Sequence, residues 1–171
     1  ATSKEDILAA SRDLIKENGW AAVSIRAVAS RCSVSAGTIY NYYESKADLL
    51  SDTIESIWHE IFFHPEDEQI FHDVETCISW IYERLEYGNR QFPGFFSLHS
   101  FGFMRDEKTS GKKRMMKTWG HILNGLCEVL GNDPKVRTDV FDQEFTEKKF
   151  ADILFSLILV SMIRQDYDPS S

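Results

Sequence analysis

The sequence predicts an all-α protein in which an N-terminal three-helix head is joined by a long fourth helix to a helical body. Three observations support this fold class. Apolar residues recur with a helical period through most of the chain. Capping residues precede these stretches, and glycine or proline follows them. No segment shows the strict alternation of apolar and polar residues that is typical of half-buried strands.

The first predicted helix begins after Ser3, which forms a capping box with Asp6. Its inner stripe starts at Ile7, and Gly19 follows its last turn as a typical C-terminal cap. The next two helices are very short. One begins after Ser24 and ends near Arg31, and the other is predicted over 36–42.

The two short helices are separated by a turn at 32–34, and Ser35 caps the second. Ile39 is its predicted inward anchor, together with Tyr43. This spacing is that of a helix-turn-helix, whose second helix enters the DNA major groove. A small helical hairpin with solvated polar residues is the alternative, because the generic pattern is weak.

The outward side chains of this segment suit DNA contact. Hydroxyl groups and the Lys46 ammonium suit phosphates, as do the N-termini of the helices. Thr38 and Asn41 reach base edges, and the methyl groups of Ala36 and Thr38 suit thymine. Gly37 costs about 1 kcal/mol in a helix and is explained by close backbone approach. The candidate DNA-binding residues are Ser24, Arg26, Ser35, Ala36, Gly37, Thr38, Tyr40, Asn41, Tyr42 and Lys46.

The body begins with a helix that Ser45 and Asp48 cap and that runs towards Phe63. A break at 64–67 follows. The later predicted segments are a helix over 68–87, breaks at Gly88 and at Pro93–Gly94, a short aromatic helix over 95–104, a loop over 105–113, a helix over 113–130, a connection over 132–142 and a last helix over 143–165.

The last helix is apolar nearly all round between Phe150 and Ile163. A helix of this kind must be covered on more than one side. In a chain of 171 residues, a second subunit is the expected cover.

The net charge of −8 is unevenly distributed along the chain. Residues 1–50 contain six basic and six acidic residues, whereas residues 51–171 contain 13 basic and 21 acidic ones. Within 24–46 there are three basic residues and one acidic residue, so the face that docks on DNA can be positive although the protein is acidic.

The segment over 24–46 resembles the DNA-binding region of the TetR family of transcriptional regulators. The resemblance covers roughly residues 3–58 and rests on the Gly19 helix end, the run over 34–43, and Ser45–Lys46 followed by an acidic residue and two leucines. It departs from the family pattern at four positions. Ala27 stands where an acidic residue is frequent, and Ala36, Asn41 and Glu44 stand where a basic residue is frequent.

The resemblance implies a DNA-binding domain over 1–46 and an effector-binding and dimerisation domain over 47–171. It implies a homodimer formed by the last two long helices, bound to a palindromic operator. A repressor released by a small apolar or aromatic effector is expected. An activator, or a regulator without a ligand, is the alternative.

An aromatic-rich segment at 92–104 is the best candidate for an effector pocket, although ordinary core packing is the alternative. The predicted lining residues are Cys77, Trp80, Phe95, Phe96, His99, Phe103, Trp119 and His121.

Other functions are less well supported. His64 and His72 flank an acidic loop, so a metal-responsive regulator is an open alternative, but no metal or other cofactor is expected. His59 and His64 are five residues apart, which does not fit a zinc-protease motif. The sequence lacks motifs of catalytic sites, so no enzyme is expected. Three widely spaced cysteines and the lack of a membrane-spanning segment favour a cytoplasmic protein. A purely structural helical dimer is a further alternative to a regulator.

Overall fold

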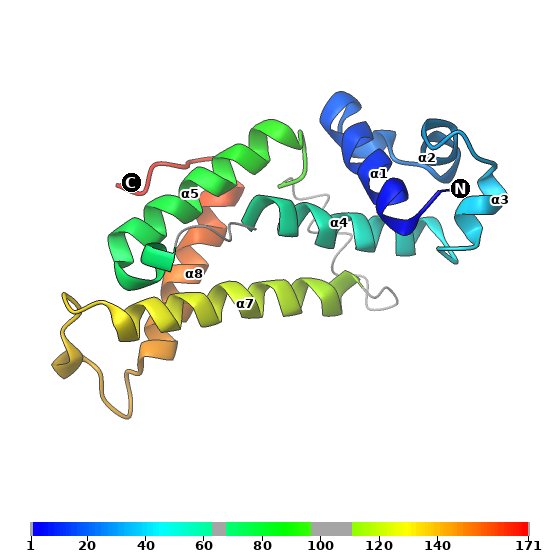
Figure 1. Cartoon of the computed structure of the whole chain (residues 1–171). Coiled ribbons are helices and arrows are strands. Elements are labelled where there is room, and N and C mark those ends of the chain that lie inside the picture. The colour runs from blue at the N-terminus through cyan, green and yellow to red at the C-terminus, as the bar shows by residue number, and fades with distance from the viewer. Residues whose placement is uncertain (1, 63–67, 97–110, 171) are drawn as a thin grey trace. The chain divides into compact units, whose positions relative to one another are not determined.

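The computed structural model describes residues 2–62, 68–96 and 111–170. Every regular element in these ranges is a helix, which confirms the predicted all-α class with its N-terminal helix-turn-helix (Figure 1). The contacts divide the chain into two compact units, each described by itself below. Unit 1 comprises Ala1–Ile61 and Tyr87–Met116, and unit 2 comprises Phe62–Glu86 and Lys117–Ser171. The functional division at residue 46 stays a prediction.

Unit 1 contains the head and the long helix that follows it. The elements are α1 (Lys4–Asn18), the short 3-10 helix η1 (Trp20–Ala22), α2 (Ile25–Arg31), α3 (Ala36–Tyr40) and α4 (Lys46–Phe62). Aliphatic side chains from each of the α-helices form the core because the apolar positions lie on one face of each helix. The fully enclosed members include Ile7, Ile15, Val28, Ile39, Leu49 and Ile57.

The predicted caps of the head are confirmed. Ser3 and Asp6 form both bonds of a capping box. The hydroxyl oxygen of Ser24 accepts from the amide of Ala27 at 3.1 Å, and that of Ser35 accepts from the amide of Thr38 at 3.2 Å. These bonds satisfy amides that a helix start leaves without partners. The second short helix ends at Tyr40, two residues earlier than the predicted range.

Unit 1 also contains an aromatic cluster that includes Trp58 of α4. The ring centroids of Phe95 and Phe96 each lie 5.6 Å from that of Trp58. Trp20 lies 6.3 Å from Phe95. The predicted helix over 95–104 is wrong at its start, since Phe95 and Phe96 lie in a turn, and its remainder lies outside the described residues. The predicted break at Pro93–Gly94 is confirmed, with Gly94 at a φ of +79°.

Gly88 does not break the chain, contrary to the sequence prediction. It lies inside α5 (Val74–Gln91), where a Cβ atom would come within 2.5 Å of Cδ1 of Ile61 and 3.2 Å of the Phe96 ring. Glycine is therefore required here by close packing of α5 and α4 within unit 1, and not by a turn.

Unit 2 contains the 3-10 helix η2 (Glu68–His72), most of α5, most of α7 (Gly111–Asn132), η3 (Thr138–Val140) and α8 (Glu147–Arg164). The helix predicted to begin at Glu68 begins at Val74 instead. The carboxylate of Asp73 accepts from the amide of Thr76 at 2.8 Å and so caps it. The helix predicted to begin at Lys113 starts at Gly111, so that part of the predicted loop is wrong.

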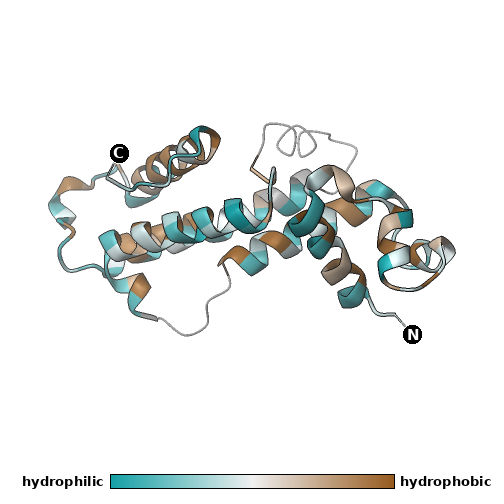
Figure 2. Ribbon diagram, turned by 90° about the horizontal axis from the view of Figure 1, so that it is seen from above, coloured by the Kyte–Doolittle hydropathy of each residue, from teal (hydrophilic) through white to brown (hydrophobic). Residues whose placement is uncertain are grey.

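The last helix starts four residues later than predicted. The carboxylate of Asp142 accepts from the amides of Glu144 and Phe145, at 2.7 and 2.6 Å, which makes a turn. Thr146 then caps α8 by accepting from the amide of Lys149 at 3.2 Å. In Figure 2, α8 is coloured as hydrophobic over most of its length. Within the described ranges, no helix is both long and apolar enough to span a bilayer.

We predict that Gly88→Ala lowers the stability of unit 1. Overpacking typically costs about 1–3 kcal/mol. The matched control is Gly131→Ala in α7, where a Cβ atom meets nothing within 4 Å and better helix propensity raises stability by up to about 1 kcal/mol. Urea unfolding of the two variants measures the difference. A Gly88→Ala protein as stable as the control would contradict the packing explanation.

Candidate nucleic-acid interface and effector cavity

The second helix of the helix-turn-helix presents one buried and several exposed side chains. Ile39 is fully buried and fixes α3 against the rest of the head, as predicted. Ser35, Tyr40 and Asn41 are exposed, and Thr38 is half-buried. The turn before α3 passes through Ser33, which has a φ of +55°. Buried and exposed residues therefore alternate with the helical period, and the polar side of α3 is open to a partner.

The other predicted contact residues differ in their exposure and in whether their polar groups already have hydrogen-bond partners. Gly37 is exposed, and the space beside it holds only the Ser35 hydroxyl at 3.6 Å from a built Cβ atom. A backbone can approach it closely. The hydroxyl of Tyr42 donates to the carbonyl oxygen of Thr2 at 2.7 Å, so its proton is already engaged in a hydrogen bond within the chain. Ser24 and Ala36 are half-buried, with the Ser24 hydroxyl serving as a helix cap.

The cations of the head are mostly paired with carboxylates of α1 and α4. Four of the six basic residues in 1–50 make such pairs, whereas Arg26 and Lys46 are exposed and have no ion pair in the part of the chain that the structure describes. The pairs are Lys4–Asp52 at 2.6 Å, Arg12–Glu5 at 2.8 Å, Lys16–Glu60 at 2.8 Å, and the two-bond contact of Arg31 with Glu17. Counting charges along the sequence treats all six as equally available.

The Arg31–Glu17 pair illustrates this loss of free charge. Both guanidinium nitrogens of Arg31 donate to the carboxylate, which lowers the pKa of Glu17. Both groups stay charged at neutral pH and largely cancel each other's field. Arg31 was not among the predicted contact residues, and this pairing gives a physical reason to leave it out.

The carboxylate of Asp52 is buried, which was not predicted from the sequence. Its oxygens contact Lys4 and Arg114 and accept from the hydroxyl of Tyr43 at 3.1 Å. Burial raises the pKa of Tyr43 to about 12, with the positive charge of Arg114 acting in the opposite direction. The signal in the sequence was an acidic residue on the apolar face of a helix, between Leu49 and Ile57.

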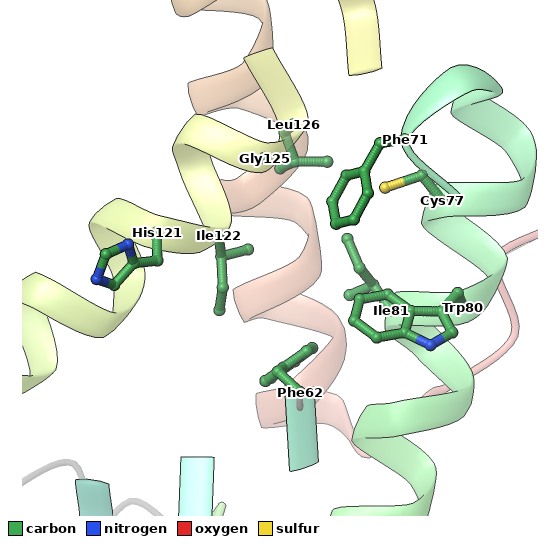
Figure 3. A pocket seen from close by; sticks show the side chains of 9 residues that line it. All are labelled: Phe62, Phe71, Cys77, Trp80, Ile81, His121, Ile122, Gly125 and Leu126. Atoms are coloured by element: carbon green, nitrogen blue, oxygen red, sulfur yellow. The ribbon is translucent and has the colours of Figure 1, made fainter. Parts of the chain in front are cut away.

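Unit 2 contains a cavity of about 170 Å³ (Figure 3). Its walls come from the end of α4, from η2, and from facing turns of α5 and α7. The residues lining it are mostly aromatic or aliphatic, and are Phe62, Phe71, Cys77, Trp80, Ile81, His121, Ile122, Gly125 and Leu126.

Three of the eight predicted pocket residues line this cavity, namely Cys77, Trp80 and His121. His121 is exposed, and Figure 3 shows its ring directed away from the other labelled side chains. Phe95 and Phe96 belong instead to the buried aromatic cluster of unit 1. Trp119 packs edge-on against Phe155, with centroids 5.7 Å apart. His99 and Phe103 lie outside the described residues.

Most of the lining residues were not predicted, because a high density of aromatic residues was taken as the signal for a pocket. The helical spacing of Cys77, Trp80 and Ile81, and of Ile122, Gly125 and Leu126, was the available signal. Burial raises the pKa of the Cys77 thiol to about 11. This thiol is therefore protonated at neutral pH and acts as an apolar wall group rather than as a nucleophile.

The metal alternative gains no support from the described residues. Nowhere among them do three His, Cys, Asp or Glu side chains gather as a metal site would require. Of the acidic loop that His64 and His72 flank, residues 64–67 lie outside the described residues, whereas Glu68–His72 forms η2.

Comparison with known proteins identifies the head. The model of a family described as "Bacterial regulatory proteins, tetR family" matches residues 7–53. The regulator UidR of Escherichia coli K12 is 38% identical over 48 residues, which cover 28% of this chain and 24% of UidR. The repressor KstR of Rhodococcus jostii is 45% identical over 47 residues, covering 28% of this chain and 22% of KstR. The match thus spans about a quarter of these curated relatives.

Solved structures resemble almost the whole chain. A transcriptional regulator from Rhodococcus sp. Rha1 has a TM-score of 0.65 at 19% identity, and the match covers 99% of this chain and 86% of that one. FadR from Bacillus subtilis, solved with stearoyl-CoA, has a TM-score of 0.61 at 17% identity and covers 95% and 86%. At such identities the likeness shows the fold.

The helix-turn-helix with its exposed polar face defines a class of DNA-binding regulators. Residues 7–53 match the TetR family of bacterial regulatory proteins, and the fold of the chain resembles that of solved transcriptional regulators.

Proposed function

We propose that this protein is a homodimeric repressor that binds a palindromic DNA operator and is released from it by a small apolar effector. The observation that carries the DNA-binding part is the geometry of α3. Ile39 anchors the helix, while Tyr40 and Asn41 are exposed beside Thr38. This arrangement matches the way in which a recognition helix enters the major groove.

The contact residues divide into two groups by chemistry. Thr38 and Asn41 read base edges, and the Ala36 methyl suits a thymine methyl. Arg26 and Lys46 contact phosphates, because they are the cations of the head that no carboxylate of the described residues engages. The remaining positions support phosphate contact through hydroxyl groups or through close approach of the backbone, and are Ser24, Ser35, Gly37, Tyr40 and Tyr42.

Few free cations imply weak dependence on salt. Two phosphate-neutralising side chains per head give about four in a dimer, and hence a slope of log K against log salt of about −4. Glu44 is exposed beside α3 and adds negative charge near the phosphates. Specificity in this protein therefore depends more on α3 and on the spacing of two heads than on charge.

The dimer is supported by the outer face of α8. Ile153, Leu157, Val160 and Ile163 are spaced at helical intervals, and Leu157 is 57% exposed in the single chain. A row of this kind is typical of a subunit interface. We propose that α7 and α8 of two subunits form a four-helix bundle, which sets the heads about 34 Å apart for two half-sites.

The effector is proposed to bind in the cavity of unit 2. Its volume of about 170 Å³ resembles the cavities of about 150 Å³ that hold benzene in other proteins. Its apolar walls favour a ligand with one ring or a short alkyl chain. A protein of this fold was solved with stearoyl-CoA, but so long a chain would require these walls to move. Repression is the proposed direction, since the relative KstR is named a repressor.

Selection of bound sequences from a random DNA pool tests the DNA-binding proposal. We expect a two-fold symmetric site. Lys46→Met should weaken all sequences alike and reduce the salt slope by about one per lost phosphate contact. Thr38→Ala or Asn41→Ala should relax preference at particular bases, at about 1–3 kcal/mol each. The control is the double variant Arg31→Met with Glu17→Gln, which removes a cation together with the carboxylate that it pairs with and so leaves the net charge of the head unchanged. Failure to enrich any sequence would refute the proposal.

Leu157→Glu is predicted to dissociate the dimer by placing a charge in an apolar interface. Light scattering should change from twice 19.7 kDa to 19.7 kDa, and binding to a paired site should fall to that of a single half-site. Gln143→Glu adds the same charge at an exposed position and should leave the dimer intact. A monomeric wild-type protein at micromolar concentration would overturn the proposal.

Alkylation of Cys77 reports occupancy of the cavity. Because the pKa of this thiol is about 11 rather than 9, its reaction with iodoacetamide at pH 8 should be roughly a hundredfold slower than that of an unperturbed thiol, and should accelerate as the pH rises towards 11. Toluene should slow it further and lower operator affinity, while Cys32 reacts unchanged. If toluene and stearoyl-CoA both leave Cys77 and operator affinity unaffected, the effector proposal is wrong.

A further inference from the structure

The buried carboxylate of Asp52 joins separate parts of unit 1. It lies in α4 and is only 7% exposed. Lys4, the first residue of α1, contacts it at 2.6 Å, and the Tyr43 hydroxyl donates to it at 3.1 Å. Arg114, near the start of α7, forms the third contact. A buried carboxylate needs such partners, because removing one leaves charge uncompensated in a poorly solvated place.

Two of these partners belong to the DNA-binding head. Lys4 begins the helix that packs on the helix-turn-helix, and Tyr43 lies between the recognition helix and α4. The hydroxyl of the adjacent Tyr42 donates a hydrogen bond to the carbonyl oxygen of Thr2. A change in how Asp52 is neutralised therefore acts directly on the segments that flank α3.

The third partner lies on the helix that also lines the cavity. Eight residues separate Arg114 from Ile122, a rise of about 12 Å along one helix. Ile122, Gly125 and Leu126 of α7 all line the cavity. A continuous helix transmits rotation or translation along its axis, so a ligand that displaces the cavity turns of α7 also moves the Arg114 guanidinium.

Arg114 has two carboxylates within reach on α4. It contacts Asp52 and also lies 3.4 Å from Glu55, which is one turn further along the helix. The Glu55 side chain is 44% exposed, whereas that of Asp52 is 8% exposed. The same guanidinium nitrogen of Arg114 lies near both carboxylates, so a small shift of Arg114 can change which of them it contacts. A switch between two states requires two such arrangements.

We propose that Arg114 is a positioning residue that couples the effector cavity to the DNA-binding head through Asp52. This inference rests on the proposed function and names its regulation. With Arg114 on Asp52, the head is held in one arrangement. Movement of α7 transfers Arg114 towards Glu55, so that Asp52 keeps only its contacts with Lys4 and Tyr43. The segments around Lys4 and Tyr43, at the two ends of the head, then become less stable.

Hydrogen exchange of the full chain without DNA tests the link itself. Arg114→Met should speed amide exchange at least fivefold around Lys4 and Tyr43. Lys113→Met removes the same charge from an exposed neighbour in α7 and should not do so. Arg114→Lys should restore most of the protection. Faster exchange confined to the first turns of α7 would overturn the inference.

A substitution that fills the cavity in place of a ligand tests whether the cavity is coupled to DNA binding. Gly125→Leu places a side chain in the cavity, and Gly131→Leu, in open space on the same helix, is its control. We expect Gly125→Leu to change operator affinity at least fivefold in the natural background and less than twofold alongside Arg114→Met. An equal change in both backgrounds would overturn the coupling. A change in neither, with the exchange result as expected, would refute the effector cavity and leave the Arg114 link standing.

Discussion

The recognition helix depends on the burial of one side chain. α3 contains only five residues, and a helix that short is not stable in water by itself. The complete burial of Ile39 against the core of the head, together with the Ser35 cap, holds α3 in place. Because one face is fixed in this way, the positions of Thr38, Tyr40 and Asn41 are set by the packing of the head rather than by their own contacts.

Electrostatics in this protein are mostly internal. Carboxylates of α1 and α4 pair with four of the six cations of the head, so the contacts that join these helices also leave few free charges on its surface. Exposed pairs such as Arg31–Glu17 contribute little stability, because water screens both charges. The buried contacts of Asp52 are different, because a charge removed from water depends on its partners. Removing a partner of Asp52 is therefore expected to cost more stability than removing the partner of Glu17.

Local signals predicted the head well, and the body less well. Ser3, Ser24, Ser35 and Ser45 were recognised as caps because capping involves atoms only three residues apart. Gly88 was misread as a break, since its reason lies in the side chain of Ile61, 27 residues away in the sequence. The predicted pocket mixed residues of two units, as aromatic density does not reveal which helices face each other.

The sequence by itself determined the helical class, the helix-turn-helix and the resemblance of the head to the TetR family, because periodicity, caps and a short motif are all local in the chain. The tertiary structure decided which cations remain free, which residues enclose the cavity, and which carboxylate Arg114 contacts. Each of these depends on side chains that are distant in sequence, such as Arg114 and Asp52 or Cys77 and Leu126. Burial and charge pairing arise only when the helices pack, and no local pattern encodes them.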